Sequence, residues 1–200
     1  MTYDELLELG QKFHGHKCPA MPLGLRAALA AMDKLGVERA TDKQLMALIE
    51  LDDDHCATCF GDGIQVASGC TFGKGNIKKL HYGKWGVTLI DKKSKRAVRV
   101  VAKAETMKKN KESEFMQLRA SGVPASQIAY EVVKPLIEMV SSAPQDALFN
   151  VSEVFEHDWQ DVPNSFESTV CESCGESVVT RNARVKDGKV VCIPCSGYER

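Results

Sequence analysis

The stretch GVTLI at residues 86–90, with AVRVV at residues 97–101, decides the fold that we predict for this chain. Both stretches are rich in β-branched residues, which favour strands. The residues between them, 91–96, are mostly charged and form a plausible turn. The pattern therefore predicts an antiparallel hairpin and, with it, a β-sheet.

Helical patterns precede this hairpin. Thr2 and Glu5 have the spacing of a capping box, and the apolar residues after them predict a first helix that ends near Phe13. Small and helix-forming residues at 23–32 predict a second, largely buried helix, which Gly36 ends.

Thr41 and Gln44 repeat the capping spacing, so we expect a third helix over Leu45, Leu48 and Ile49. After the hairpin, helical patterns cover residues 111–120 and 126–140, and residues 148–151 indicate one more strand. Pro135 is expected to kink or restart the second of these helices.

The predicted fold class is α+β, with helices packed on an antiparallel sheet, followed by a small treble-clef or zinc-ribbon-like module. We assign residues 1–156 to the core and residues 169–200 to the module. Residues 157–168 between them are polar, contain a proline, and have the composition of a linker.

Two CxxC pairs, separated by seventeen residues, mark the C-terminal module. They consist of Cys171 and Cys174, then Cys192 and Cys195. This spacing is typical of a four-thiolate zinc site, which leaves no coordination position for substrate and is therefore structural. Two disulfides or four unrelated thiols are the alternative. The stretch RVKDGKVV at 184–191 predicts a hairpin with an Asp-Gly turn that carries Cys192 to the metal.

The composition narrows the classes of function. Among 200 residues, 26 are basic and 27 acidic, so the net charge gives no reason to expect binding to nucleic acid or to anionic lipid. No basic, apolar leader opens the chain, and no apolar run is long enough to cross a membrane. We therefore expect a cytoplasmic protein that has no membrane partner and whose thiols are reduced.

His14, His16 and Cys18 place three ligand-type side chains at a period of two. In an extended segment these side chains would share one face, where imidazole and thiolate groups could bind a borderline metal or act as base and nucleophile. The alternative is a hydrogen-bonded core histidine beside an inert buried cysteine.

A second group of thiol and polar residues falls between positions 52 and 70. Cys59 or Cys70 could complete a metal site begun at Cys18, and Asp62 could orient a histidine ring or act as a general base. The acidic run at 52–54 is equally a solvated loop or a helix cap. Cys56 and Cys59 also form a CxxC pair, although the βαβ context of a dithiol redox protein is missing.

The stretch GCTFGKGN at 69–76 is similar to a phosphate-binding loop, but its spacing does not match a Walker A motif. It offers backbone N–H groups and Lys74 as an anion contact, or simply a tight connection.

Five ordered blocks together resemble the E subunit of formylmethanofuran dehydrogenase, strongly over residues 10–90 and more weakly to about residue 155. The blocks are FHGHKCP at 13–19, LGLR at 23–26, CFGDGIQV at 59–66, GCTFGKGN at 69–76 and YGK at 82–84. The resemblance implies an α+β core, an intertwined homodimer and a His/Cys pocket that binds metal. It also implies a link to a molybdenum or tungsten enzyme that interconverts carbon dioxide and formylmethanofuran.

Carried over position by position, the resemblance implies a core metal site of His16, Cys18, Cys59 and Cys70. Its candidate catalytic residues are His14, His16, Cys18, Cys59 and Asp62, and its weaker candidates for contact with a cofactor are Thr71, Lys74 and Asn76. Ala20, Phe60, Gly61 and His81 depart from the family pattern, so the family's substrate does not transfer.

Two hypotheses of function follow. In the first, the chain is a metal-binding relative of that subunit, with zinc in the C-terminal module and a second metal in a core pocket that serves one-carbon or redox chemistry. In the second, it is a regulatory protein whose core senses metal or a small ligand and whose module contacts protein or nucleic acid. Whether the chain is itself an enzyme stays open between them.

Overall fold

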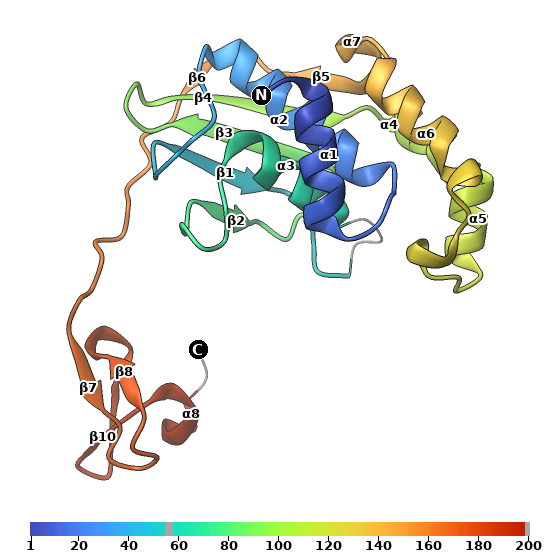
Figure 1. The fold of residues 1–200 in the computed structure, drawn as a ribbon. Helices are drawn as coiled ribbons and strands as arrows, with labels where there is room; N and C mark the ends of the chain where they lie inside the picture. The colour runs from blue at the N-terminus through green and yellow to red at the C-terminus, as the bar shows by residue number, and fades with distance from the viewer. Residues whose placement is uncertain (55–57, 199–200) are drawn as a thin grey trace. The chain divides into compact units, whose positions relative to one another are not determined.

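The computed structural model describes residues 1–54 and 58–198, which divide into two compact units, Met1–Trp159 and Gln160–Arg200 (Figure 1). Both helices and a β-sheet build the first unit, so the predicted α+β class is confirmed. No described helix combines the length and the apolar character that crossing a membrane would require.

A six-stranded sheet forms the centre of the first unit, with the order β2-β1-β3-β4-β5 and β6 added to β4. The predicted hairpin is present as β3 (Gly86–Asp91) and β4 (Arg96–Ala102), in antiparallel register. The predicted last strand is present as β5 (Phe149–Val151), and β6 is Phe155–Glu156. The sheet is mixed rather than purely antiparallel, because β2 (Ile77–Lys79) runs parallel to β1.

The third predicted helix is wrong: Leu45, Leu48 and Ile49 belong to strand β1 (Leu45–Ile49). All five residues of β1 are buried, because the strand lies between β2 and β3 and both its faces are covered. A strand buried on both faces has no polar alternation, so its short apolar run resembles one face of a helix. Gln44 does reach Thr41, but by a side-chain hydrogen bond of 3.0 Å outside any helix.

Three helices lie on one face of this sheet, the second and third against the strands and the first against those two helices. Helix α1 (Tyr3–His14) begins at the predicted Thr2–Glu5 capping box, and α2 (Ala20–Leu35) is buried along most of its length and ends at Gly36 in left-handed conformation. Helix α3 (Cys59–Ser68), which the sequence did not predict, packs on α2. The main hydrophobic core lies between α2, α3 and the inner face of β1, β3 and β4.

Further helices complete the first unit after β4: α4 (Ala104–Lys111), α5 (Glu114–Ala120), a turn of 3-10 helix η1 (Ala125–Gln127), α6 (Tyr130–Ser142) and α7 (Gln145–Leu148). Pro135 lies inside α6, which continues through it, so the expected restart of the helix is wrong. Arg26 on α2 donates hydrogen bonds of 2.8 Å to the carbonyls of Val140, Ser141 and Ala143, which fixes the C-terminal end of α6.

Two hairpins and one helical turn form the second unit. They are β7 (Ser168–Val170) with β8 (Ser177–Val179), β9 (Arg184–Lys186) with β10 (Lys189–Val191), and α8 (Ile193–Ser196), with a 3-10 turn η2 (Thr180–Asn182) between the hairpins. The predicted Asp-Gly turn is present, with positive φ at Asp187 and Gly188. This arrangement fits a zinc-ribbon-like module.

Candidate metal centre

Three segments of the first unit bring four ligand-type side chains together. His14 is the last residue of α1, Cys18 comes before Pro19, the N-cap of α2, and Cys59 is the first residue of α3. Together with His16 they place one ligand atom each within 4.8 Å of the others. The expectation of an extended segment is wrong. Instead, Gly15 caps α1 at a φ of 84° and turns the chain so that both histidines face the same point.

Two glycines allow α2 and α3 to approach closely enough to join Cys18 and Cys59. A Cβ atom on Gly24 would lie 1.9 Å from the carbonyl oxygen of Phe60, and one on Gly63 would lie 2.0 Å from the carbonyl oxygen of Met21. Any side chain at either position would therefore push the two helices apart. The close packing explains why the first turn of α3 lies against the start of α2.

The distances in this group fit a tetrahedral metal centre. His14 Nε2 lies 3.1 Å from His16 Nε2 and 3.7 Å from Cys18 Sγ. Zinc-type bond lengths place two nitrogen ligands about 3.3 Å apart, and a nitrogen and a sulfur ligand about 3.6 Å apart. Two imidazole nitrogens and two sulfurs suit zinc and other borderline metals. The four side chains could thus hold such an ion with little movement.

Asp62 orients His14 from behind. Its Oδ2 atom lies 2.7 Å from Nδ1 of His14, so the carboxylate accepts a hydrogen bond from that nitrogen and leaves Nε2 directed at the group. A carboxylate that holds the far nitrogen of a ligand histidine is a common feature of metal sites. The hydrogen bond to Asp62, followed by that to Cys59, raises the pKa of His14 to about 9.

Burial and mutual contacts shift the pKa values of the other three side chains. Burial, followed by the nearby His14 and Arg119, lowers the pKa of His16. The hydrogen bond between the two thiols lowers the pKa of Cys18 and raises that of Cys59, a division typical of two sulfurs that share one proton. The group thus holds protons that a metal ion would displace.

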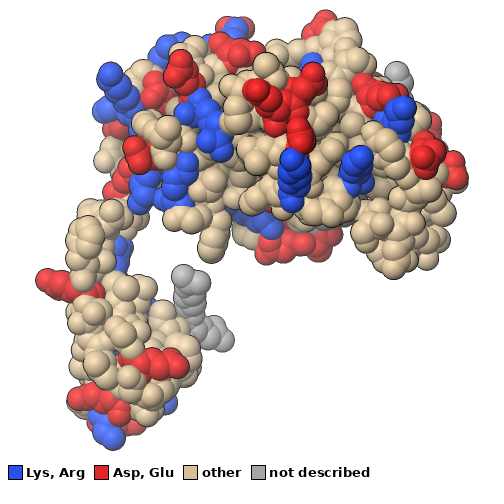
Figure 2. Space-filling model, in the orientation of Figure 1, with Lys and Arg blue, Asp and Glu red and all other residues tan. Residues whose placement is uncertain are grey.

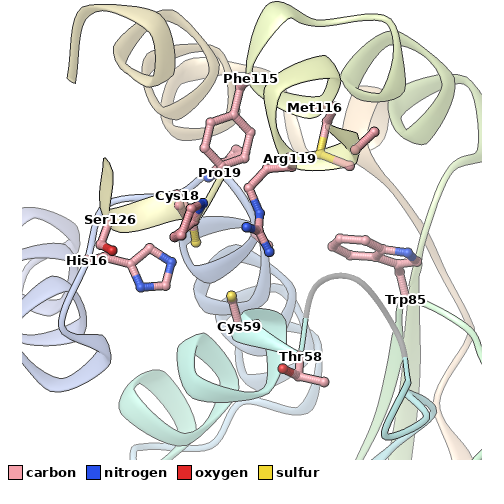
Figure 3. Close-up of a pocket in the computed structure, with 14 residues that line it drawn as sticks. His16, Cys18, Pro19, Thr58, Cys59, Trp85, Phe115, Met116, Arg119 and Ser126 are labelled. Carbon is pink, nitrogen blue, oxygen red and sulfur yellow. The ribbon is translucent and has the colours of Figure 1, made fainter. Parts of the chain in front are cut away.

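A cavity of about 570 Å³ opens beside this group. His16, Cys18 and Cys59 form part of its wall, and Figure 3 shows the imidazole and both sulfurs facing the same space. Trp85, before β3, and Phe115 and Met116 of α5 add an apolar wall, while Arg119 of α5 extends its guanidinium into the cavity. This volume is in the range of small-molecule sites.

Cys70 lies apart from this group, although the family resemblance implies that it belongs to the core metal site. It follows the C-terminal end of α3, whereas Cys59 begins that helix, so about 15 Å of helix separates them. Its side chain is fully buried, and burial raises the pKa of its thiol. In the described part of the chain, His14 takes the place predicted for Cys70.

The three residues proposed to contact a cofactor make hydrogen bonds to the backbone. Lys74 Nζ donates to the carbonyls of Ala40 and Thr41, and the buried Asn76 donates to those of Asp42 and Leu45. Thr71 accepts from the backbone N–H of Lys74. The loop is thus a tight connection that leads into β2. Cys56, the partner of Cys59 in the CxxC pair, lies outside the described residues.

The four cysteines of the second unit also converge. Their sulfurs lie within 4.8 Å of one another, and Cys174 Sγ is 3.9 Å from Cys192 Sγ, against about 3.8 Å for two thiolates on one zinc ion. Hydrogen bonds from the backbone N–H groups of Cys174 and Cys192 lower the pKa of Cys171 to about 6. The set fits a tetrahedral four-thiolate centre.

A third group, Asp52, Asp53 and His81, is exposed and forms ion pairs within itself and with Lys79. Figure 2 shows how widely charged side chains of both signs are spread over the surface of the first unit. Exposed acidic groups of this kind are common without a metal ion.

Sequence reasoning missed the cavity wall contributed by α5 and η1. Arg119 lies far along the chain from Cys18 and Cys59, in a short helix of ordinary composition, so no local motif marks it. The fold alone brings it to the cavity that Cys18 and Cys59 line.

This chain is similar to known proteins in sequence and in structure. The family described as "FmdE, Molybdenum formylmethanofuran dehydrogenase operon" matches residues 13–150. A probable S-adenosyl-L-methionine-binding protein of Archaeoglobus fulgidus is 33% identical over 201 residues, which cover 96% of this chain and 52% of that protein. The chain thus spans about half the length of this relative.

A solved structure shares the fold. It is the crystal structure of an FmdE-like protein from Syntrophus aciditrophicus, described as similar to the E subunit of tungsten formylmethanofuran dehydrogenase. The TM-score is 0.65 at 20% identity, with 98% of this chain and 93% of that chain covered.

Proposed function

This chain belongs to the FmdE family, and from that premise we propose that it binds a transition metal in its core and a small-molecule ligand in the cavity beside that metal. The observation that carries the proposal is the convergence of His14, His16, Cys18 and Cys59 within 4.8 Å of one another, with the last three lining the cavity. The core metal would then serve one-carbon or redox chemistry, and zinc in the four-cysteine module would be structural.

The surroundings of the two candidate metal groups support a structural role for one and a ligand-binding role for the other. Four thiolates in a small unit close a tetrahedron and stabilise a fold. The core group, in contrast, presents three of its four side chains to a cavity that has room for a ligand. A metal there would act as a Lewis acid toward a bound group if one of the four side chains left it or if it took a fifth ligand. Asp62 would hold the ring of His14 so that its Nε2 atom faces the metal.

Metal analysis of full-length variants tests the proposal. We expect two metal equivalents per chain in the unaltered protein and in Cys70→Ser, whose thiol is buried outside both groups. The double variant Cys18→Ser/Cys59→Ser should retain one equivalent, and Cys171→Ser/Cys174→Ser should lose the other. Unchanged metal content in Cys18→Ser/Cys59→Ser would refute the core site.

A second candidate function is binding of S-adenosyl-L-methionine. The relative from Archaeoglobus fulgidus that is 33% identical to this chain carries that ligand in its name. The cavity has the volume of a site for a nucleoside-sized molecule. Equilibrium dialysis with labelled S-adenosyl-L-methionine tests this candidate, with Ala125→Trp, which fills the cavity, as the control. Equal binding by both proteins, or none by either, would reject the cavity as the site.

We also propose that the protein is a homodimer, as its family resemblance implies. Several large apolar side chains of the first unit are exposed in the single chain, among them Phe13 at 59% and Phe72 at 89%. Size-exclusion chromatography with light scattering should therefore give twice the chain mass of 22.0 kDa. A mass of one chain at micromolar concentration would contradict this proposal.

A further inference from the structure

The charge of the cavity wall identifies the class of ligand. In the described part of the chain, no Asp or Glu lines the cavity, and Arg119 is the one Lys or Arg that does. Two thiolates and two neutral imidazoles would neutralise a divalent ion at the metal centre. Among the described residues that line the cavity, the one formal side-chain charge away from the metal centre is then that of Arg119, while Asp62 lies behind His14 and outside the lining.

Arg119 is held in place by the protein but keeps donors for a ligand. Its Nη1 atom donates a hydrogen bond of 2.7 Å to the carbonyl of Val123, four residues along the chain. This bond uses one of five N–H donors, and the guanidinium points into the cavity toward Cys59 (Figure 3). A fixed guanidinium with a free edge binds a planar anion through two parallel hydrogen bonds.

The rest of the wall is mostly apolar. Trp85, Phe115 and Met116 offer aromatic and thioether surface, and Thr58 and Ser126 offer hydroxyl groups. Phe115 is buried, and Trp85 packs edge-to-face on Phe60 with ring centroids 5.8 Å apart, so both walls are fixed. Such a surface accommodates an apolar or aromatic body next to the charged end.

From these observations we propose that the cavity binds a small organic anion, with its anionic group on Arg119 and its apolar body against Trp85 and Phe115. This inference rests on the proposed function, which makes the cavity a ligand site, and it adds the charge and shape of the ligand. Arg119 is then the residue that selects anions over neutral molecules of the same shape.

Two fluorescent probes of matched shape test this inference in the full-length protein. Anilinonaphthalene sulfonate carries an anionic group on an aromatic body, and N-phenylnaphthylamine has the same body without the charge. We expect Arg119→Met to weaken binding of the sulfonate by about tenfold or more, because charge-assisted hydrogen bonds are lost. Binding of the neutral probe should change less than about twofold, which shows that the cavity is intact. Arg119→Lys should keep part of the affinity for the sulfonate.

Two controls locate and separate the effects. Ala125→Trp fills the cavity and should abolish cavity binding of both probes, whereas Arg181→Met, in the second unit, should change neither. Equal loss of both probes in Arg119→Met, an unchanged affinity for the sulfonate, or no binding by the unaltered protein would each overturn the inference. Metal content measured on the same samples tests the proposed metal centre separately. A protein that contains no core metal but still prefers the sulfonate through Arg119 would refute the core metal site and support the anion site.

Discussion

At the scale of single residues, the pairing of Asp62 with His14 should control metal affinity. The carboxylate fixes the ring so that Nε2 faces the other ligands, 3.1 Å from His16 Nε2. Loss of a carboxylate behind a ligand histidine typically weakens metal binding about 10- to 100-fold. We therefore expect Asp62→Asn to weaken core zinc binding by that factor, measured by competition with a chromophoric chelator. Asp146→Asn, on the exposed helix α7, is the matched control, and an equal affinity in both variants would contradict this role.

The protonation of His14 predicts a pH dependence for the same site. With its pKa raised to about 9, His14 carries a proton at neutral pH, and a metal ion must displace it. Core zinc affinity should therefore rise as the pH increases toward about 9, after which this contribution ends. In Asp62→Asn the main cause of the raised pKa is missing, so the rise should end at a lower pH. The measurement is chelator competition across the pH series, and superimposable curves for the two proteins would argue against this prediction.

Cys70 and His14 show how much of the candidate metal site the sequence could predict. The sequence identified the cluster of histidine and cysteine side chains around Cys18 and Cys59, because thiol and imidazole groups at that density are rare as packing. It named both His14 and Cys70 as candidates but could not choose between them, since that choice depends on the ten-residue helix α3 that separates Cys70 from Cys59. Nothing in the local spacing revealed that helix.

At the scale of elements, the contact between α2 and α3 should be sensitive to the smallest added side chain. Gly24→Ala would place Cβ against a backbone carbonyl, which cannot rotate away. The clash should outweigh the gain in helix propensity and destabilise the protein by about 2 kcal/mol or more. Core metal content should fall as well, because Cys18 and Cys59 move apart. Gly73→Ala, where a Cβ would meet nothing within 4 Å, is the matched control for urea denaturation. Equal midpoints for the two variants would count against the close contact.

Strand β1 and helix α3 explain which elements the sequence could predict. The β3–β4 hairpin, α1 and α2 carry strand-forming residues, a capping box or a glycine stop, and all three are present as predicted. Strand β1 carries no such mark, because burial on both faces removes its alternation. Helix α3 begins with cysteine and contains two glycines, a composition typical of a loop. Both failures arise from tertiary packing that outweighs local propensity.

At the scale of the whole molecule, the two candidate metal groups differ in how much the fold around them should depend on a bound ion. The first unit has an extensive core between the helices and the sheet, and none of its four candidate metal ligands belongs to that core. The second unit buries little apolar surface, and two of its three buried core residues, Cys171 and Cys192, are themselves candidate ligands. A unit of this kind depends on its metal for folding, because its apolar core is too small.

Removal of metal should therefore affect the two units of the full-length chain differently. After treatment with a strong chelator under reducing conditions, we expect the amides of β7 to β10 to exchange rapidly with deuterium, since the four-thiolate centre no longer holds them. The amides of β1, β3 and β4 should stay protected, because their hydrogen bonds lie in a sheet whose core needs no ion. Hydrogen exchange with mass spectrometry measures both regions in one sample, and added zinc should restore protection in β7 to β10. Loss of protection in β3 and β4 would mean that the core metal supports the fold of the first unit and is not only a ligand centre at its cavity.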